Sequence, residues 1–305
     1  MGGGSYSSDV YRSISDSFVN TDRADIFKSR KLDKSMSPKG VLFREARDSV
    51  EHPETVPIII GLDVTGSMGI IPEQLCKGKL GTLIETMLKH NVAHPAVMFT
   101  AIGDHYFDNA PLQIGQYESG TEQLVQWLTT VFLESGGGGQ DMESYMLAWL
   151  FAARHTSIDH FEVRNKKGYL FTIGDERVHP VVEGKFLKEL MGYEKAEDIT
   201  SEELLKEAQR MYEVFHIHAN STGYRNNPSV IGSWKDLLGE RALVLDDHEM
   251  VAELISSQVS IMEGANIADV VKDFDASTAD AITKALAPVK PGAVTNSKTT
   301  GAVEL

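Results

Sequence analysis

The chain has 305 residues, of which 42% are hydrophobic and 24% charged, and these values exclude a fibrous or wholly disordered protein. Its formal net charge is −15, from 29 basic and 44 acidic residues, and no basic stripe is present, so we expect no nucleic-acid partner. A single cysteine, Cys76, excludes an intrachain disulfide and a cysteine-built zinc site, and no apolar run of about 18 residues predicts a membrane span.

Residues 1–52 are predicted to be an N-terminal extension. They are polar and rich in Ser, Asp and Arg, and their few apolar side chains are scattered. We expect short helical pieces that pack on a neighbouring part, and no separate domain. The first residues lack the apolar core of a signal peptide, so we expect a cytoplasmic protein.

Two apolar runs open the region 53–263, which we predict to be one α/β domain. Residues 56–62 and 96–102 are almost entirely apolar, as parallel strands buried on both faces are. Between them, an early proline and apolar residues at helical spacing predict one helix over 72–89. A short strand near 112–114 is expected at a sheet edge.

Strands and helices continue to alternate through the rest of that region. A helix is expected to begin after Gly120-Thr121, and a further helix, apolar almost all round, runs to about His155 and should lie centrally. A capping box at Thr200-Ser-Glu-Glu203 predicts the start of another helix. The remaining elements are strands at 169–173, 212–219 and 242–245 and a helix over about 248–262.

This alternation predicts a three-layer, Rossmann-like α/β fold. The sheet should be mostly parallel, with one short antiparallel edge strand and with helices on both faces. Residues 264–286 are predicted to be a helical extension. Residues 287–305 have too little apolar surface to fold, so we expect a flexible tail there.

Acidic side chains follow three of the predicted strands. Asp63, Asp104 and Asp175 each come directly after a strand, and Asp141 opens the central helix. Ligands of such sheets bind at the carboxyl ends of the strands, where carboxylates without a cation would repel one another. Mg²⁺ prefers oxygen ligands. The absence of a Cys/His cluster at these positions argues against zinc or copper. We therefore predict a Mg²⁺ site, with Mn²⁺ or Ca²⁺ as alternatives.

The spacing Asp63-x-Thr65-x-Ser67 places one carboxylate and two hydroxyls on one side of an extended turn. This pattern resembles the metal-ion-dependent adhesion site (MIDAS) of the von Willebrand factor A (VWA) family, and the resemblance covers about residues 54–262. Three further motifs are similar to loops of that family in order and spacing. They are Gly137-Gly-Gly-Gly-Gln-Asp141-Met-Glu143-Ser144, Thr172-Ile-Gly-Asp175 and, as in the alpha-kinase-associated branch, Ile102-Gly-Asp104-His-Tyr106-x-Asp108.

The resemblance implies a VWA fold whose metal ion is held by five residues: Asp63, Thr65, Ser67, Asp141 and Asp175. Asp104, Glu143, Ser144 and Gly139 would support these ligands without direct contact to the ion. The family implies a metal-dependent protein-interaction module that binds an acidic side chain of a partner protein, in some members within a larger complex or an ATPase system. Integrin-type members have Thr where this chain has Asp141, so we expect weaker capture of the acidic group.

Other interpretations remain open at these positions. Asp63 to Ser67 could simply cap a helix, Asp141 could be an N-cap, and Asp175 could be a polar strand end. His216 and His218 share a strand face, but no third ligand is near them in sequence, so we expect a strand-end pair and no zinc site.

The alternative function is a Mg²⁺-dependent phosphoryl-transfer or hydrolytic enzyme on a Rossmann-like fold. Asp63 and Gly174-Asp175 superficially resemble the haloacid dehalogenase pattern. That pattern requires an Asp at the position of Thr65, and no nucleophile–base pair is apparent. We therefore expect a binding protein and no enzyme.

Overall fold

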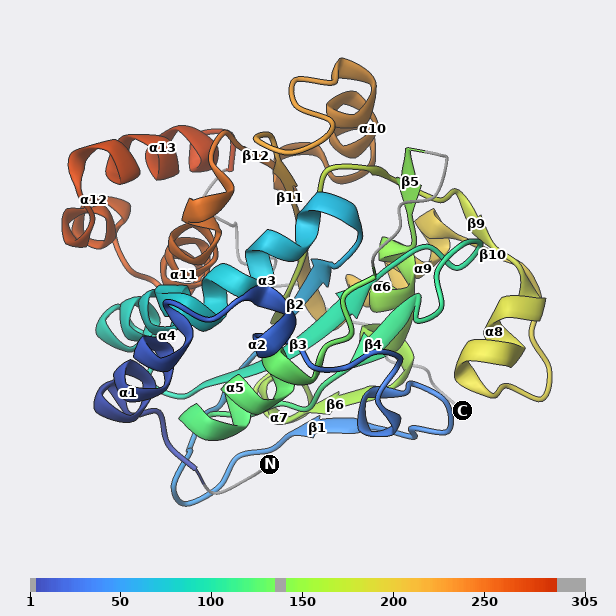
Figure 1. The fold of residues 1–305 in the computed structure, drawn as a ribbon, viewed down its shortest axis with the longest axis horizontal. Coiled ribbons are helices and arrows are strands. Elements are labelled where there is room, and N and C mark those ends of the chain that lie inside the picture. The colour runs from blue at the N-terminus through green and yellow to red at the C-terminus, as the bar shows by residue number, and fades with distance from the viewer. Residues whose placement is uncertain (1–3, 135–140, 290–305) are drawn as a thin grey trace, which may run out of the picture.

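The structure is a computed structural model that describes residues 4–134 and 141–289. Its centre is a six-stranded sheet with the strand order β12-β11-β7-β2-β3-β4 (Figure 1). Neighbouring strands are parallel, except that β4 runs antiparallel to β3 at the edge. The strands are β2 (Val56–Asp63), β3 (Pro95–Ile102), β4 (Leu112–Ile114), β7 (Gly168–Gly174), β11 (Tyr212–Ala219) and β12 (Ala242–Leu245). The predicted sheet, including its antiparallel edge strand, is confirmed.

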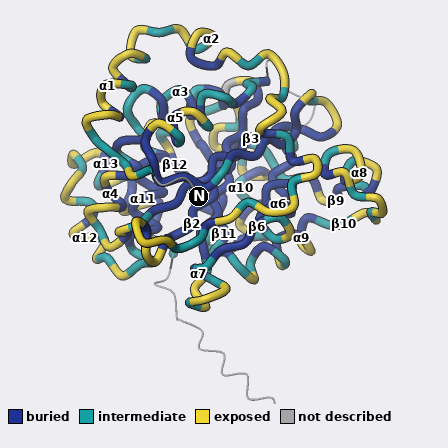
Figure 2. Tube along the Cα trace, turned by 90° about the horizontal axis from the view of Figure 1, so that it is seen from below, coloured by how far each residue is buried: buried dark blue, intermediate teal, exposed yellow. Residues whose placement is uncertain are grey.

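Each face of the sheet is covered by its own hydrophobic cluster. Ile58 and Ile60 of β2 belong to one cluster, and Ile59 between them belongs to the other, so successive residues are buried on opposite faces. One cluster includes α4 (Leu80–Lys89), α5 (Thr121–Thr130), α11 (Val251–Met262) and α13 (Ala276–Leu286). The other includes α6 (Tyr145–Arg154), α8 (Gly184–Met191), α9 (Ser201–Ala208) and α10 (Pro228–Leu238). The fold therefore has three layers, with the buried strands of the sheet between two layers of helices (Figure 2).

Several helix predictions are confirmed in detail. Helix α6 is buried from Tyr145 to Ala152, which places it centrally against the sheet, as its apolar sequence indicates. Helix α9 begins with the capping box, in which Thr200 and Glu203 exchange hydrogen bonds between side chain and backbone. Helix α5 begins at Thr121, directly after Gly120.

The single helix predicted over 72–89 is interrupted. The chain forms a short 3₁₀ turn (Gly66–Gly69), α3 (Ile70–Gln74), a π-helical turn (Leu75–Lys79) and then α4. Gly78 has a φ of 153°, a conformation that only glycine adopts without strain. The apolar spacing continues across this point, so periodicity alone could not locate the break.

The N-terminal extension contains α1 (Ser8–Phe18), α2 (Arg23–Ile26), a 3₁₀ turn (Lys34–Met36) and β1 (Arg44–Ala46). Strand β1 pairs in parallel with β6 (Thr156–Ile158), outside the main sheet. Tyr11 of α1 is buried, and its hydroxyl donates a hydrogen bond to the Leu75 carbonyl at 2.7 Å. Helix α1 of the extension therefore packs on α4 and the π-helical turn.

Short elements complete the described part of the chain. They are β5 (Met142–Glu143), α7 (Asp159–Glu162), β8 (Arg177–Val178), β9 (Val181–Val182), β10 (Ile199–Thr200), α12 (Ile267–Val270) and 3₁₀ turns at Gly239–Arg241, His248–Met250 and Val271–Asp273. The predicted tail lies outside the described residues from 290 onward. Among the residues described, no helix has the length and apolar character needed to span a bilayer.

Two features of the topology position the candidate site. From β2 the chain moves first to β3 on one side, and it later returns to β7 on the other side, so the connections diverge between β2 and β7. Ligands of open α/β sheets bind at such a switch point. In addition, β5 pairs in parallel with β8, with Met142 opposite Arg177, and this brings the segment 141–144 beside 175–179.

Candidate metal centre

Asp63 ends β2 at the switch point and is 1% exposed. Its Oδ1 accepts hydrogen bonds from the Thr65 backbone N–H at 2.9 Å and from the Thr65 hydroxyl at 2.7 Å. Its Oδ2 accepts one from the Tyr145 hydroxyl at 3.0 Å. The tight turn that places Thr65 beside Asp63 is the local structure expected both for a metal loop and for a capping turn.

Asp175 follows β7 and is also buried. Its Oδ2 accepts hydrogen bonds from the Thr222 hydroxyl at 2.7 Å and the Tyr224 backbone N–H at 3.2 Å. Burial, with the nearby charge of Asp175, raises the pKa of Asp63 to about 7. The structure thus brings together the two aspartates that follow the adjacent strands β2 and β7.

Two glutamates share this site. Glu143 is 1% exposed, and its Oε2 has no hydrogen-bond partner among the described residues. Burial raises the pKa of Glu143 far above its usual range, and Asp63 and Glu176 add to the effect. Burial, followed by the charges of Asp63 and Asp175, raises the pKa of Glu176 to about 8. We call Asp63, Glu143, Asp175 and Glu176 the carboxylate cluster.

The carboxylate cluster carries more acidic groups than a buried site tolerates without protons or a cation. Among the described residues, no three of its members bring ligand oxygens within 4.8 Å of one another. An ion here would therefore take one or two of the carboxylates and complete its shell with hydroxyls or water, which is the usual coordination of Mg²⁺.

Gly174 allows the close approach of Tyr145 to β7. A Cβ atom at position 174 would lie 1.8 Å from the Tyr145 hydroxyl oxygen, so only glycine fits there. Tyr145 is the first residue of the central helix, and its hydroxyl reaches Asp63 across this gap. The glycine before Asp175 is therefore part of what holds Asp63 in place.

Asp141 forms an ion pair with a basic side chain of the same protein. Its carboxylate pairs with Arg177, and this hydrogen bond lowers the pKa of Asp141 below its usual range. The pairing follows from the β5–β8 register, which puts Arg177 beside this segment. Burial, with the charges of Glu176, Asp141 and Asp175, raises the pKa of Tyr224. Gly139 and the side chain of Ser67 lie outside the described residues.

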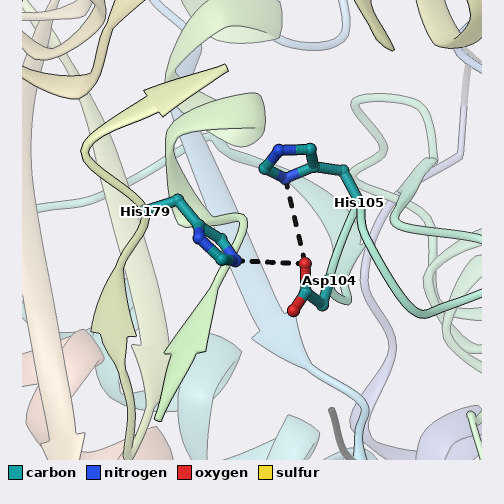
Figure 3. A group of neighbouring side chains, drawn as sticks. All are labelled: Asp104, His105 and His179. Atoms are coloured by element: carbon teal, nitrogen blue, oxygen red, sulfur yellow. Dashed lines mark hydrogen bonds and ion pairs between the residues drawn. The ribbon is translucent and has the colours of Figure 1, made fainter. Parts of the chain in front are cut away.

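A second cluster lies after β3. Asp104, His105 and His179 each bring one potential ligand atom within 4.8 Å of the others, and all three residues are buried. The Nε2 of His179 is 3.0 Å from Asp104 Oδ1, and the Nδ1 of His105 is 4.0 Å from the same oxygen (Figure 3). We call these three residues the Asp–His cluster. The sequence showed no Cys/His cluster beside the strand-end carboxylates, whereas the fold brings two histidines to Asp104.

Ser144 and Glu143 connect the two clusters. The Ser144 hydroxyl accepts a hydrogen bond from the His105 backbone N–H at 2.9 Å and lies 2.7 Å from His105 Nδ1. The Glu143 carbonyl accepts a hydrogen bond from the His179 backbone N–H at 3.2 Å. Asp104 and Asp108 also contribute to the raised pKa of Glu143. The segment 143–144, predicted only to support the metal ligands, therefore supplies Glu143 to the carboxylate cluster and contacts the Asp–His cluster.

His105 sits among aromatic side chains beside Asp104. Burial, with the neighbouring His179, lowers the pKa of His105 to about 4. Its ring packs edge-on against Phe186 and His179, with centroids 4.6 and 4.9 Å away. Its imidazole is therefore neutral at pH 7 and able to bind a cation through a ring nitrogen.

Some residues of both clusters were missed in the sequence. Glu176 and His105 directly follow aspartates that the motifs include, so adjacency was the available signal. Tyr145 and His179 carry no local signal, because they reach the site through helix α6 and through the β5–β8 pairing.

The histidines at 216 and 218 form no metal site with a third ligand among the described residues. His216 Nδ1 lies 3.0 Å from the Thr172 hydroxyl, and its ring stacks on Trp234 with centroids 3.5 Å apart. Packing explains His216, as expected of a strand residue on a buried face.

No family model matches this chain, and no curated protein matches it. Among solved structures, the pilus adhesin SpaC from Lactobacillus rhamnosus GG is similar in its open conformation, with 10% identity, a TM-score of 0.42 and coverage of 77% of this chain and 31% of the adhesin. A second form of SpaC gives 12% identity, a TM-score of 0.41 and coverage of 77% and 32%. This chain spans about a third of the length of those adhesin chains. A likeness at this level carries no argument about function.

Proposed function

We propose that this chain is a Mg²⁺-dependent protein-interaction module of the VWA type. The observation that carries the proposal is the carboxylate cluster at the switch point of the sheet. Buried acidic groups there raise one another's pKa, and the Glu143 Oε2 atom has no hydrogen-bond partner among the described residues. A divalent cation is the charge that such a group of carboxylates accommodates best.

The ligands in this proposal are Asp63, Thr65, Ser67 and Asp175, with Asp141 released from Arg177 or acting through water. The residues described fit this role, because Asp63, Thr65 and Asp175 are buried and lie on adjacent loops. A bound Mg²⁺ would supply positive charge and one coordination position for an acidic side chain of a partner protein. Binding of this kind suits an accessory subunit of a larger complex or of an ATPase system.

Binding is favoured over turnover by the residue at position 65. Asp63 Oδ1 accepts two hydrogen bonds from Thr65, whereas Oδ2 accepts one from Tyr145 and keeps a lone pair for an ion. Thr65 also occupies the place where a phosphoryl-transfer enzyme of the haloacid dehalogenase pattern would have its acid–base Asp.

The proposal is tested with Asp63→Asn and with Asp280→Asn as a matched control, since Asp280 is exposed on α13. Calorimetric titration with Mg²⁺ should show one binding event in the wild type and in Asp280→Asn, and none in Asp63→Asn. Proteins retained by the immobilised wild-type chain in Mg²⁺ should be lost both in EDTA and with Asp63→Asn.

Two results would overturn the proposal. Equal Mg²⁺ binding by Asp63→Asn and the wild type would remove the site. Mg²⁺-dependent hydrolysis of a phosphomonoester that disappears in Asp63→Asn would establish the enzyme alternative instead.

A further inference from the structure

The Asp–His cluster has donor chemistry that differs from the carboxylate cluster. Two imidazoles and one carboxylate are ligands typical of Zn²⁺ and related borderline cations, whereas Mg²⁺ rarely binds nitrogen. The two histidines come from different loops, one directly after β3 and one after β8, and both meet at Asp104. A chance pair of neighbouring surface residues would not show this convergence.

The distances suit a single small cation. Ligand atoms around a tetrahedral zinc ion lie about 3.3 Å apart, given bonds of about 2.0–2.1 Å. His179 Nε2 and His105 Nδ1 lie 3.0 and 4.0 Å from Asp104 Oδ1. All three ligand atoms lie within 4.8 Å of one another, and the value for a zinc ion falls between the two distances to Asp104.

Two buried polar atoms of the cluster lack a hydrogen-bond partner within the described part of the chain, and this also favours a bound cation. Asp104 is 0% exposed, yet its Oδ2 has no hydrogen-bond partner among the described residues. His105 is 5% exposed, and its Nε2 lacks a hydrogen bond as well, with Glu183 Oε2 3.6 Å away. A buried polar atom without a partner costs about 1–3 kcal/mol, and a cation bound by both carboxylate oxygens of Asp104 would recover the cost at Oδ2.

The surroundings also resemble the outer layer of a metal site. The Asp104 carboxylate is fixed by the Tyr106 backbone N–H, which donates to its Oδ1 at 2.9 Å. The Ser144 hydroxyl lies 2.7 Å from His105 Nδ1, so beside an ion bound by that nitrogen it would offer a further oxygen. Partners that orient ligands in this way commonly accompany protein metal sites.

We propose that Asp104, His105 and His179 form a second metal site, selective for Zn²⁺ or a similar borderline cation and separate from the Mg²⁺ site. Its two histidines are hydrogen-bonded through their backbone N–H groups to the segment 143–144. A cation there would tie the loop after β3 to the loop after β8. The full chain would then carry two divalent ions of different chemistry at one edge of the sheet.

The test uses Co²⁺ as a spectroscopic substitute for Zn²⁺ in the 305-residue chain, with Mg²⁺ in excess to fill the carboxylate cluster. The wild type should develop visible ligand-field bands that saturate at one equivalent and are displaced by Zn²⁺. His179→Gln and Asp104→Asn should weaken Co²⁺ binding by more than about 100-fold, since removal of a ligand exceeds the loss from an outer partner.

Two control variants separate this site from others. His94→Gln changes a histidine at the opposite end of β3 and should bind Co²⁺ as the wild type does. Asp63→Asn should also keep the Co²⁺ bands, so failure of the Mg²⁺ proposal would leave this result unaffected. Unchanged binding in His179→Gln, or no bands in the wild type, would overturn the second site.

A measurement on the wild type alone decides the matter if the variants do not fold. Crystals grown with Zn²⁺ should give an anomalous-scattering peak at the zinc edge between Asp104 and His179. The absence of a peak at this position at saturating Zn²⁺ would refute the site.

Discussion

Asp63 combines burial with a negative neighbour, and its hydrogen bonds only partly compensate. Three donated hydrogen bonds, two from Thr65 and one from Tyr145, favour its ionised form. Burial and Asp175 oppose ionisation and prevail, so the pKa rises to about 7. The residue is therefore close to the point where a bound cation would change its protonation at neutral pH.

Asp63→Asn should flatten the dependence of stability on pH. In the metal-free wild type, a carboxyl whose pKa is raised on folding stabilises the fold fully below its unfolded pKa of about 3.9. This stabilisation is lost as the pH rises through about 7, where folded Asp63 ionises. Urea unfolding in EDTA at about pH 5 and about pH 8 should therefore show a smaller difference for Asp63→Asn than for the wild type.

Magnesium should reverse part of that loss, because it favours the ionised carboxylate. The wild type should gain more stability from Mg²⁺ at about pH 8 than at about pH 5, and Asp280→Asn should behave like the wild type. A wild type whose stability rises steadily over this range in EDTA would contradict the raised pKa of Asp63.

Gly174→Ala should destabilise the protein by about 1–3 kcal/mol, the usual cost of overpacking a buried position. The new Cβ would lie 1.8 Å from the Tyr145 hydroxyl, so either β7 or the first turn of α6 must shift. Gly232→Ala is the control, because a Cβ at position 232 meets nothing within 4 Å and alanine favours the helix. Urea unfolding measures both, and equal stability of the two variants would contradict the contact.

Among the helices and strands, those with a clear apolar pattern in the sequence were the ones that could be predicted. Strands β2, β3, β7 and β11 are buried on both faces, and their apolar runs could be identified in the sequence. Strands β5 and β8 have two residues each and no such pattern. Their pairing places Arg177 on Asp141 and His179 on Asp104, so this part of the site could not be predicted from local sequence.

Tyr11→Ala should lower stability by about 3–5 kcal/mol, as for other large buried side chains, because it removes a ring that packs against Gly81. Tyr11→Phe should cost about 1 kcal/mol, since only the hydrogen bonding of the hydroxyl to the Leu75 and Cys76 carbonyls is lost. Urea unfolding and limited proteolysis of the extension check both changes.

Val10→Ala is the control for the extension, because Val10 is 39% exposed and its loss should change stability by less than about 0.5 kcal/mol. A Tyr11→Ala variant as stable as Val10→Ala would show that α1 does not contribute to the fold as its packing indicates.

At the scale of the whole molecule, the net charge of −15 bears on the proposed partner. A negatively charged chain repels an acidic protein at long range, so in the proposed complex the attraction would come from a bound cation at short range. Moderate salt should then screen the repulsion and leave the direct metal contact largely intact.

The overall α/β architecture could be predicted because clear strand and helix patterns alternate along the sequence. The hydrophobic cluster on one face of the sheet includes more segments of the chain than the sequence indicated. It includes Tyr11 and Phe27 from the extension, Phe171 from the sheet, and Ile282 and Leu286 from α13. Segments from both ends of the described chain therefore share one core with the central strands.

Ile282→Ala should consequently destabilise the entire molecule by about 2–5 kcal/mol and leave no folded remainder. Ile282 is 0% exposed within that shared cluster, so loss of its side chain weakens contacts to α11 and the sheet together. Calorimetry should show one transition that moves to lower temperature as a unit, with coincident changes in far-UV and near-UV circular dichroism. The neighbouring exposed Thr283→Ala should leave the transition almost unchanged. A separate early transition in Ile282→Ala, with the main one unmoved, would show instead that α13 unfolds independently of the sheet.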